Sequence, residues 1–257
     1  MNQFDPSGSG KLKAGDHHYK AYVGPPSQYD FMGATQFRLL CALGLRAHHS
    51  LLDVGCGSLR AGRLFISYLD ANRYCGIEPN RWLIEEAIIN QLGQDQIRIK
   101  NPRFDDNATF STEMFAEKFD FVVAQSIFSH TGQDLTSMAL ENLGEALKPD
   151  GILAATFVEG RNNSLGNGWV YPDCVAYRPT QIRKFAVAAG LFVVRLPWYH
   201  PRQAWYLFSK DKTRLPSLGQ RKHLTGAVLF DPEFEESWNW RRAFLRDAKS
   251  LIKRLLP

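Results

Sequence analysis

The sequence predicts an α/β protein built on one sheet that is parallel except at one edge. Apolar runs of strand length alternate with amphipathic helical segments through most of the 257 residues. The first apolar run ends in a glycine-rich turn, Gly55-Cys56-Gly57, that leads into a helix. The last two apolar runs, 191–196 and 204–208, are separated by seven residues, 197–203, which is too short for a crossover helix. They must therefore be antiparallel neighbours.

The expected elements follow from these patterns in chain order. Continuous or alternating apolar runs predict strands at 50–54, 74–77, 97–100, 119–124, 152–157, 191–196 and 204–208. Apolar residues at helical spacing predict helices over 31–43, 60–69, 82–92, 135–147 and 180–189. Glycine follows three of these helices, at Gly44, Gly93 and Gly190, where it suits a helix end.

Composition sets the broad class. An apolar content of 44% with 12% aromatic residues is ordinary for a globular protein. The four cysteines form no C-x-x-C pair, so we expect neither disulfides nor a zinc site, and a reducing compartment. No stretch has the length of a membrane span and the polar start lacks a signal sequence, so we expect a cytoplasmic protein.

Four segments are expected along the chain. Residues 1–16 form a flexible N-terminus, 17–49 an aromatic and helical leading segment, 50–210 the α/β domain and 211–257 a basic extension.

A carboxylate and two glycines mark a site for an adenosine-containing cofactor. Gly55 and Gly57 let the backbone turn tightly and approach a ligand closely. Glu78 ends the second apolar run, where a carboxylate can accept hydrogen bonds from a ribose diol. A dinucleotide-binding turn needs a third glycine, G-x-G-x-x-G, but Arg60 stands at that position. The turn was therefore not built for a pyrophosphate.

The run D-V-G-C-G-S-L-R-A-G, followed by G-I-E-P-N, resembles motifs I and II of the class I S-adenosylmethionine-dependent methyltransferases. The resemblance covers residues 30–210. It implies a seven-stranded Rossmann-like sheet with an antiparallel last strand and an N-terminal helical lid over the cofactor cleft. It also implies S-adenosyl-L-methionine as cofactor, S-adenosyl-L-homocysteine as its product, and methyl transfer as the activity.

The resemblance also implies roles for cofactor-site residues. Asp53 would lie near the methionine amino group and Glu78 would hold the ribose. Phe104 and Asp105 would flank the adenine, with Asp106 or Asn107 as alternatives to them. The other expected cofactor contacts are Gly55, Cys56, Gly57, Pro79, Gln125 and Ser126.

A second group of residues is expected on the acceptor side. His130 follows the fourth strand and is a candidate general base, or else a structural histidine. Tyr22 and Tyr29 are candidates for the lid, or simply cover the sheet edge. The long aperiodic stretch 159–177 suits a pocket or a self-packed loop. The remaining expected acceptor contacts are Tyr171, Tyr177, His200 and Arg202.

The expected reaction is O-methylation of a small or medium polar acceptor such as a sugar, phenol or secondary metabolite. N- or S-methylation of a small molecule, and a non-catalytic cofactor-binding subunit, stay open as alternatives; a nicotinamide-dependent oxidoreductase is a weaker one. A catechol-type metal site needs an aspartate after the fourth strand and an Asp-Asn pair after the fifth. Gln125-Ser126 and Glu159-Gly160 stand there instead, so no metal is expected.

The basic character of the chain is concentrated at its C-terminus. Residues 241–257 hold six basic residues and one acid. The net charge of this segment therefore equals the net charge of +5 of the whole chain. Apolar residues at helical spacing between 238 and 256 predict a basic amphipathic helix. Such a helix can pack on the domain or a partner subunit, or lie on an anionic membrane surface at the inner face of the membrane. The neutral body disfavours nucleic acid as a partner.

Overall fold

The fold is a single seven-stranded sheet between two layers of helices, as the sequence predicts. The structure is a computed structural model that describes residues 12–226. Its strand order is β3-β2-β1-β4-β5-β7-β6, with β7 antiparallel to both of its neighbours. The strands are β1 Leu51–Val54, β2 Tyr74–Ile77, β3 Arg103–Asp105, β4 Phe119–Ala124, β5 Leu147–Phe157, β6 Phe192–Leu196 and β7 Ala204–Ser209.

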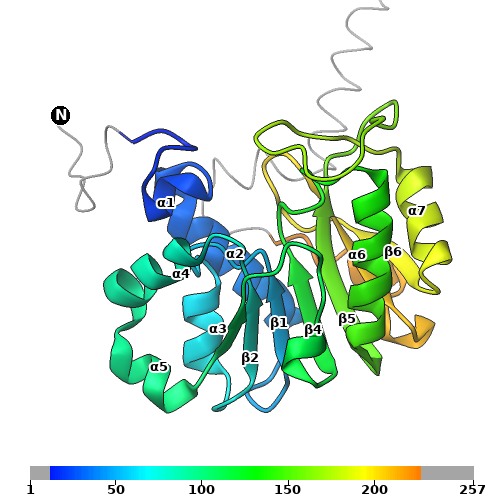
Figure 1. Cartoon of the computed structure of the whole chain (residues 1–257). Coiled ribbons are helices and arrows are strands. Elements are labelled where there is room, and N and C mark those ends of the chain that lie inside the picture. Colours follow the sequence, from blue (N-terminus) through cyan, green and yellow to red (C-terminus); the bar gives the residue numbers. More distant parts are fainter. Residues whose placement is uncertain (1–11, 227–257) are drawn as a thin grey trace, which may run out of the picture.

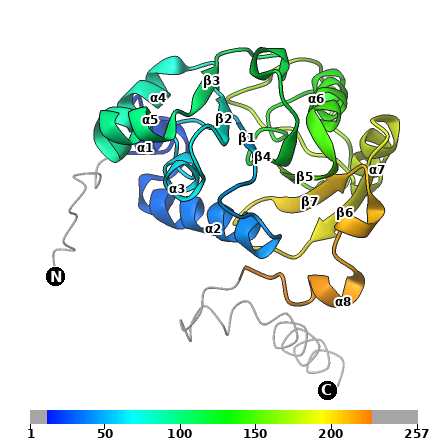
Figure 2. The same ribbon diagram turned by 90° about the horizontal axis from the view of Figure 1, so that it is seen from below.

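Helices cover both faces of the sheet (Figures 1 and 2). α6 and α7 lie on one face, and α2 and α3 lie on the other, where they contact each other. The helices are α1 Tyr19–Tyr22, α2 Tyr29–Ala42, α3 Gly62–Tyr68, α4 Arg81–Ala87, α5 Gln94–Lys100, α6 Gln133–Ala146, α7 Pro179–Ala188 and α8 Leu218–Arg221. A π-helical turn, Ile88–Leu92, continues α4, so the predicted helix 82–92 changes geometry at its centre.

The sheet separates two apolar cores. Successive side chains of β1 point to opposite faces, so Leu52 packs in the core beneath α6 and Leu51 in the core beneath α2. Five of the six residues of β4 are apolar and buried, because helices cover both faces of the sheet. Asp120 is the exception, and its carboxylate accepts hydrogen bonds from the Ser50 N–H and the Lys148 ammonium. This explains why the parallel strands read as continuous apolar runs.

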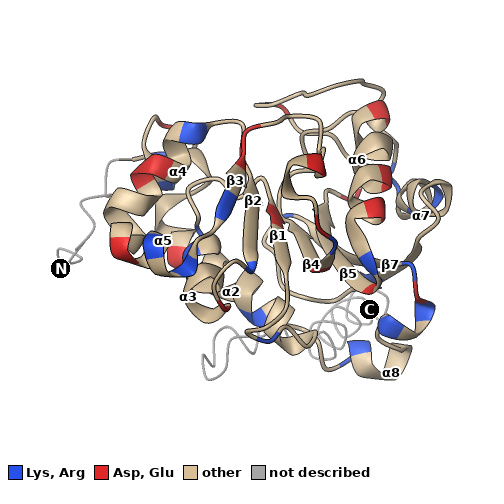
Figure 3. Cartoon of the chain, turned by 60° about the horizontal axis from the view of Figure 1, so that its bottom comes forward, with Lys and Arg blue, Asp and Glu red and all other residues tan. Residues whose placement is uncertain are grey.

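The predicted third strand was wrong. Residues 97–100 belong to helix α5, and the third strand follows at Arg103–Asp105. Ile97 and Ile99 alternate with polar residues as a strand would, but Ile99 is 58% exposed, so no sheet face buries it. Asp95 in the first turn and Lys100 in the last suit the helix dipole, and Figure 3 shows both charge signs on α5.

The fifth strand is longer than predicted. It begins at Leu147 rather than at 152, because residues expected to form a turn extend the strand beside β4. Its pairing with β4 shifts register between Phe119 and Phe121, which accommodates the extra residues.

The leading segment, residues 17–49, contacts the loop between β6 and β7. Nε1 of Trp198, in the β6–β7 loop, donates a hydrogen bond to the carbonyl of Thr35 in α2 at 3.2 Å. The division of the chain into four segments, and a lid role for 17–49, stay predictions. The expected tail helix between 238 and 256 and most of the flexible start lie outside the described residues. Between residues 12 and 226, no helix has the length and apolar character needed to cross a membrane.

The contact between α2 and the turn before α3 gives a stability prediction. A Cβ at Gly33 would lie 2.4 Å from the carbonyl oxygen of Arg60, a backbone atom that cannot swing away. We expect Gly33→Ala to lower the free energy of unfolding by about 1–3 kcal/mol in urea denaturation. At Gly219 the nearest atom is 3.9 Å away, so Gly219→Ala should be neutral or slightly stabilising. Equal effects of the two substitutions would contradict this packing.

Candidate functional site

The strand order reverses direction between β1 and β4, and ligands of open α/β sheets bind at the carboxyl ends beside such a point. These ends lie at the top of Figure 1, below the loop 158–178 and beside the leading segment. The loops after β1, β2, β3 and β4 therefore meet at one place.

The turn after β1 has a backbone that only glycine adopts readily. Gly55 and Gly57 have φ angles of 65° and 54°. A Cβ at Gly55 would meet the side chain of Ile127 at 2.0 Å, and one at Gly57 would meet Val23 at 2.8 Å. The turn is therefore closely approached from the loop after β4 and from the leading segment.

Glu78 is fixed at the tip of β2 beside this turn. Its Oε2 accepts a hydrogen bond from the N–H of Gly57 at 3.0 Å. Its Oε1 accepts two more, from the backbone and side-chain nitrogens of Asn80, each at 2.9 Å. The side chain is buried but the neighbouring Pro79 is exposed. The carboxylate thus has one orientation, with lone pairs left for a ligand.

Asp53 precedes the turn and Cys56 lies within it, and both side chains are buried. The hydroxyl of Tyr74 donates a hydrogen bond to Asp53 Oδ2 at 2.9 Å. Burial raises the pKa of Asp53 to about 7, although this hydrogen bond and the charge of Arg60 oppose the shift. Cys56 packs in the core against Gly76, and burial raises the pKa of its thiol. The side chain of Cys56 therefore packs as part of the apolar core.

A pocket of ≈ 130 Å³ opens next to Glu78. Its walls come from β3 and its following loop and from α4: Glu78, Arg81, Ile84, Glu85, Ile88, Phe104, Asp105 and Asp106. Asp105 accepts hydrogen bonds from Asn107 through both carboxylate oxygens, at 3.3 and 2.8 Å. The structure thus brings the expected adenine residues together beside the expected ribose carboxylate.

Gln125 is a buried amide without hydrogen-bond partners. It is 7% exposed, and neither its Nε2 nor its Oε1 has a partner among the described residues. Leaving such groups unpaired costs about 1–3 kcal/mol. A polar ligand with both donors and acceptors would satisfy this amide, so the residues present fit the amino-acid or ribose end of the expected cofactor. The adjacent Ser126 has φ 63° and donates its N–H to Thr156 Oγ1 at 2.7 Å.

His130 and two tyrosines meet on the acceptor side. The ring of Tyr171 lies 5.2 Å from that of His130 and 6.0 Å from that of Tyr22. Nδ1 of His130 lies 2.7 Å from the carbonyl oxygen of Asp173. Because a carbonyl only accepts, Nδ1 carries a proton, and in the neutral ring the lone pair is therefore on Nε2.

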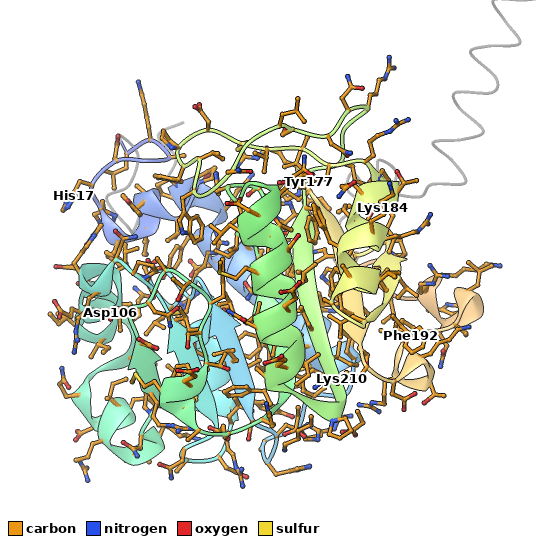
Figure 4. All side chains as sticks on the ribbon, turned by 45° about the vertical axis from the view of Figure 1, so that its right-hand side comes forward. His17, Asp106, Tyr177, Lys184, Phe192 and Lys210 are labelled. Atoms are coloured by element: carbon orange, nitrogen blue, oxygen red, sulfur yellow. The ribbon has the colours of Figure 1, made fainter. Side chains whose placement is uncertain are left out.

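Tyr29 and Tyr177 lie elsewhere than expected. Both are buried, and each hydroxyl donates at 2.7 Å to a backbone carbonyl, that of Ser58 for Tyr29 and that of Thr131 for Tyr177. Figure 4 shows Tyr177 beside α6, well away from His17 in the leading segment. These aromatics anchor loops to the core, and we no longer assign them to the acceptor.

One ring nitrogen of His200 accepts hydrogen bonds from the backbone of its own loop. Its Nδ1 accepts hydrogen bonds from the backbone N–H groups of Arg202 and Gln203, at 3.3 and 3.0 Å. Burial, with the charges of Arg60 and Arg202, lowers the pKa of His200 to about 3, so its ring is neutral. The side chain of Arg202 is exposed.

Two residues beside the candidate site were not predicted from the sequence. Trp82 stacks on His17 with 4.4 Å between ring centroids and meets Tyr22 edge-on at 5.4 Å. Gln203 donates from Nε2 to Ser126 Oγ at 3.1 Å, tying the β6–β7 loop to the loop after β4. Trp82 lies four residues beyond Glu78, at the start of a helix, so its position after the strand-two carboxylate was the available signal. Gln203 had none.

The comparisons with known proteins agree on one fold. Residues 52–153 match the family described as a methyltransferase domain. Over this segment the predicted resemblance to the S-adenosylmethionine-dependent methyltransferases is confirmed, and the solved structures similar in fold include methyltransferases with S-adenosylmethionine bound. Comparison with curated protein sequences gives no significant match.

Solved methyltransferase structures are similar to this chain in fold. The CcbJ methyltransferase from Streptomyces caelestis has a TM-score of 0.56 at 15% identity, over 74% of this chain and 98% of that one. A TehB-like methyltransferase from Corynebacterium glutamicum has 0.52 at 20% identity, over 76% and 98%. Magnesium protoporphyrin IX methyltransferase from Synechocystis, with bound S-adenosylhomocysteine, has 0.53 at 12%, over 72% and 84%. At these identities the likeness is one of fold.

The buried carboxyl group of this methyltransferase gives a pH prediction. The folded-state pKa of Asp53, about 7, exceeds its ordinary value of 3.8, so the folded chain binds more protons than the unfolded chain between these values. The free energy of unfolding therefore falls as pH rises from about 4 to 7 and levels off above it.

Urea denaturation at pH 5 and pH 8 tests this contribution. Asp53→Asn keeps an acceptor for Tyr74 but cannot ionise. The loss of stability between the two pH values should be about 2–3 kcal/mol smaller in the variant than in the wild type. The same pH dependence in both proteins would show that Asp53 is ionised at pH 5.

Proposed function

We propose that this methyltransferase transfers a methyl group from S-adenosylmethionine to a hydroxyl of a small or medium polar acceptor. A sugar, a phenol or a secondary metabolite would suit the site. The observation that carries the proposal is His130, which follows β4 with its Nδ1 proton engaged by the Asp173 carbonyl at 2.7 Å. Its Nε2 lone pair is therefore available to a proton-bearing nucleophile.

The contacts at the strand ends support the cofactor-binding roles that we propose. Glu78 would accept the ribose hydroxyls, since three N–H donors already hold its carboxylate in place. Phe104, with Asp105 or Asp106, would flank the adenine in the pocket beside Glu78. Gln125, Ser126 and Asp53 would face the methionine end. When bound, S-adenosylmethionine supplies a methyl group already activated by its sulfonium.

The chain itself would position the acceptor and remove its proton. Tyr171 and Tyr22 would form the walls that orient the acceptor, an effect of placement that can reach roughly 7–11 kcal/mol. His130 Nε2 would take the hydroxyl proton as the oxygen attacks the methyl carbon. The Asp173 carbonyl would hold the ring in the tautomer that does this and stabilise its cationic form.

Hydroxyl methylation is favoured over two alternatives. One solved neighbour is a glycopeptide N-methyltransferase, so N-methylation is compatible with the fold, as is S-methylation. A neutral amine needs no base before attack, however, whereas a hydroxyl does, and a base with a fixed tautomer is present. A non-catalytic cofactor-binding subunit would need no such group next to the strand-four loop.

A two-part experiment tests the proposal. Isothermal titration with S-adenosylhomocysteine measures cofactor binding. Transfer of label from [methyl-³H]S-adenosylmethionine to a panel of phenols, sugars, amines and thiols then identifies which compound accepts the methyl group. Binding together with labelled methyl ethers is the expected result. Binding with label only on nitrogen or sulfur would overturn the O-methyl assignment.

Glu78→Ala should weaken S-adenosylhomocysteine binding about 10–150-fold, because it removes charge-assisted hydrogen bonds worth about 1.5–3 kcal/mol. Titration calorimetry provides the dissociation constants. Glu86→Ala is the matched control, since Glu86 is an exposed glutamate on α4 that bonds Asn90. Unchanged affinity in Glu78→Ala would remove the ribose assignment.

His130→Asn should lower kcat about 10²–10⁴-fold with the acceptor found in the transfer assay. Asparagine can still donate to the Asp173 carbonyl but offers no base. The dissociation constant of S-adenosylhomocysteine, measured in parallel, should stay within about 3-fold. A variant that retains wild-type kcat would show that His130 is structural.

A further inference from the structure

Gln203, in the loop between β6 and β7, is joined to the turn that carries His130. Its Nε2 donates to Ser126 Oγ at 3.1 Å and to Ser129 Oγ at 3.4 Å. These two serines belong to residues 126–130, the turn that follows β4 and ends at His130. One side chain from another part of the chain therefore contacts the turn at two points.

The first residue of this turn has a backbone conformation that needs support. Ser126 has φ 63°, in the left-handed region that residues other than glycine rarely adopt. Its N–H donates to Thr156 Oγ1 at 2.7 Å, and its carbonyl accepts from Ser129 Oγ at 3.1 Å. Such a conformation persists only where several contacts determine it together. The hydrogen bond from Gln203 to the Ser126 hydroxyl is one of these contacts.

Ser129 determines which way the amide of Gln203 points. A hydroxyl has one proton, and Ser129 donates its proton to the Ser126 carbonyl, so its Oγ can only accept from Gln203. The amide nitrogen is therefore on the serine side. The amide oxygen, Oε1, is buried and has no partner among the described residues. An unpaired buried oxygen lowers stability, which indicates that this amide has a role beyond folding.

The loop around Gln203 is itself firmly held. The N–H of Gln203 donates to Nδ1 of His200 at 3.0 Å. Nε1 of Trp198 donates to α2, as described above, and the N–H of Tyr199 donates to the carbonyl of Thr225 at 2.9 Å. The loop is thus anchored to α2 and to the segment after α8, and it presents the Gln203 amide to the turn as a fixed support.

A second loop holds His130 directly. The His130 carbonyl accepts from the N–H of Val170 at 2.9 Å, and Nδ1 lies 2.7 Å from the carbonyl oxygen of Asp173. These contacts orient the ring relative to the loop 158–178. The contacts of Gln203 instead fix the turn that places His130 relative to the sheet, so the two loops control different degrees of freedom of the same imidazole.

We infer that Gln203 is a positioning residue for His130, acting through Ser126 and Ser129. This inference rests on the proposed function, in which His130 takes a proton from the acceptor. It also gives His200 a role, because His200 holds the backbone of Gln203. A misplacement of about 1 Å caused by a change away from the chemistry can lower the rate about 10²-fold. The hydrogen bonds of Gln203 to the turn would prevent such a misplacement.

Gln203→Met keeps the length of the side chain and removes both polar atoms. It should lower kcat about 10–100-fold with the acceptor found in the transfer assay. The dissociation constant of S-adenosylhomocysteine should stay within about 3-fold. Gln96→Met is the matched control, because Gln96 in α5 also donates to a serine hydroxyl, that of Ser67 in α3, at 3.4 Å. The control should keep the wild-type kcat.

A double-mutant cycle separates positioning of His130 from a general structural effect. In the His130→Asn background, Gln203→Met should change kcat by less than about 3-fold, because a support for the imidazole has no effect once the imidazole is absent. Ser129→Ala removes one partner of Gln203 and should behave in the same way. Equal effects of Gln203→Met in both backgrounds would overturn the inference. Weaker S-adenosylhomocysteine binding with unchanged kcat would also overturn it and assign Gln203 to the cofactor.

NMR of the histidine ring nitrogens tests the inference without any turnover. The His130 signals are assigned as those missing from His130→Asn. At alkaline pH the wild type should show one tautomer, with the proton on Nδ1, and Gln203→Met should show a mixture of both tautomers. The same single tautomer in both proteins would overturn the inference.

The two measurements distinguish this inference from the proposed function. If no acceptor is methylated, the proposed function fails, and the tautomer of His130 in Gln203→Met still decides whether Gln203 positions the ring. If an acceptor is methylated and Gln203→Met retains the wild-type kcat, only this inference fails.

Discussion

The hydrogen bond from the Gly57 N–H to the Glu78 carboxylate, 3.0 Å long, is the contact on which the rest of the site depends. It joins the turn after β1 to the tip of β2, two strands that pair in parallel along their whole length. A carboxylate that receives a backbone N–H is charge-assisted and directional. The proposed ribose position and the proposed adenine pocket are therefore both set relative to one fixed group.

The two faces of the sheet make different contributions. The α6 side is an apolar core, and it anchors the loop 158–178 through buried groups such as the Tyr177 hydroxyl. The α2 side holds charged residues next to the glycine turn, among them Asp53 and Arg60. The β6–β7 hairpin closes that side, because Trp198 bonds α2 and Gln203 bonds the loop after β4. The antiparallel hairpin is thus part of the site as well as of the topology.

The sequence predicted those features that depend on local chemistry. The glycine turn and the strand-two carboxylate each predicted a local structure directly, and the short 197–203 gap allowed only an antiparallel pair of strands. The observed strand order agrees with these predictions. The strand at 97–100 failed because two isoleucines with alternating polar neighbours fit an exposed helix equally well. Tyr29 and Tyr177 were expected at the acceptor because an aromatic side chain in an aperiodic segment looks the same whether it lines a pocket or anchors a loop. Only tertiary contacts separate these cases, and the same holds for Gln203.

The central claim is that this turn holds the nucleoside of S-adenosylmethionine and not a dinucleotide. Arg60 occupies the position of the third dinucleotide glycine, and its backbone carbonyl is packed against Gly33, so the glycine that a dinucleotide site uses for close helix–strand packing is missing here. Titration of the wild-type protein with S-adenosylhomocysteine, in the absence and presence of excess NADH, tests this directly. The account predicts saturable binding of S-adenosylhomocysteine that NADH does not displace. Displacement by NADH, or NADH binding without S-adenosylhomocysteine binding, would contradict it.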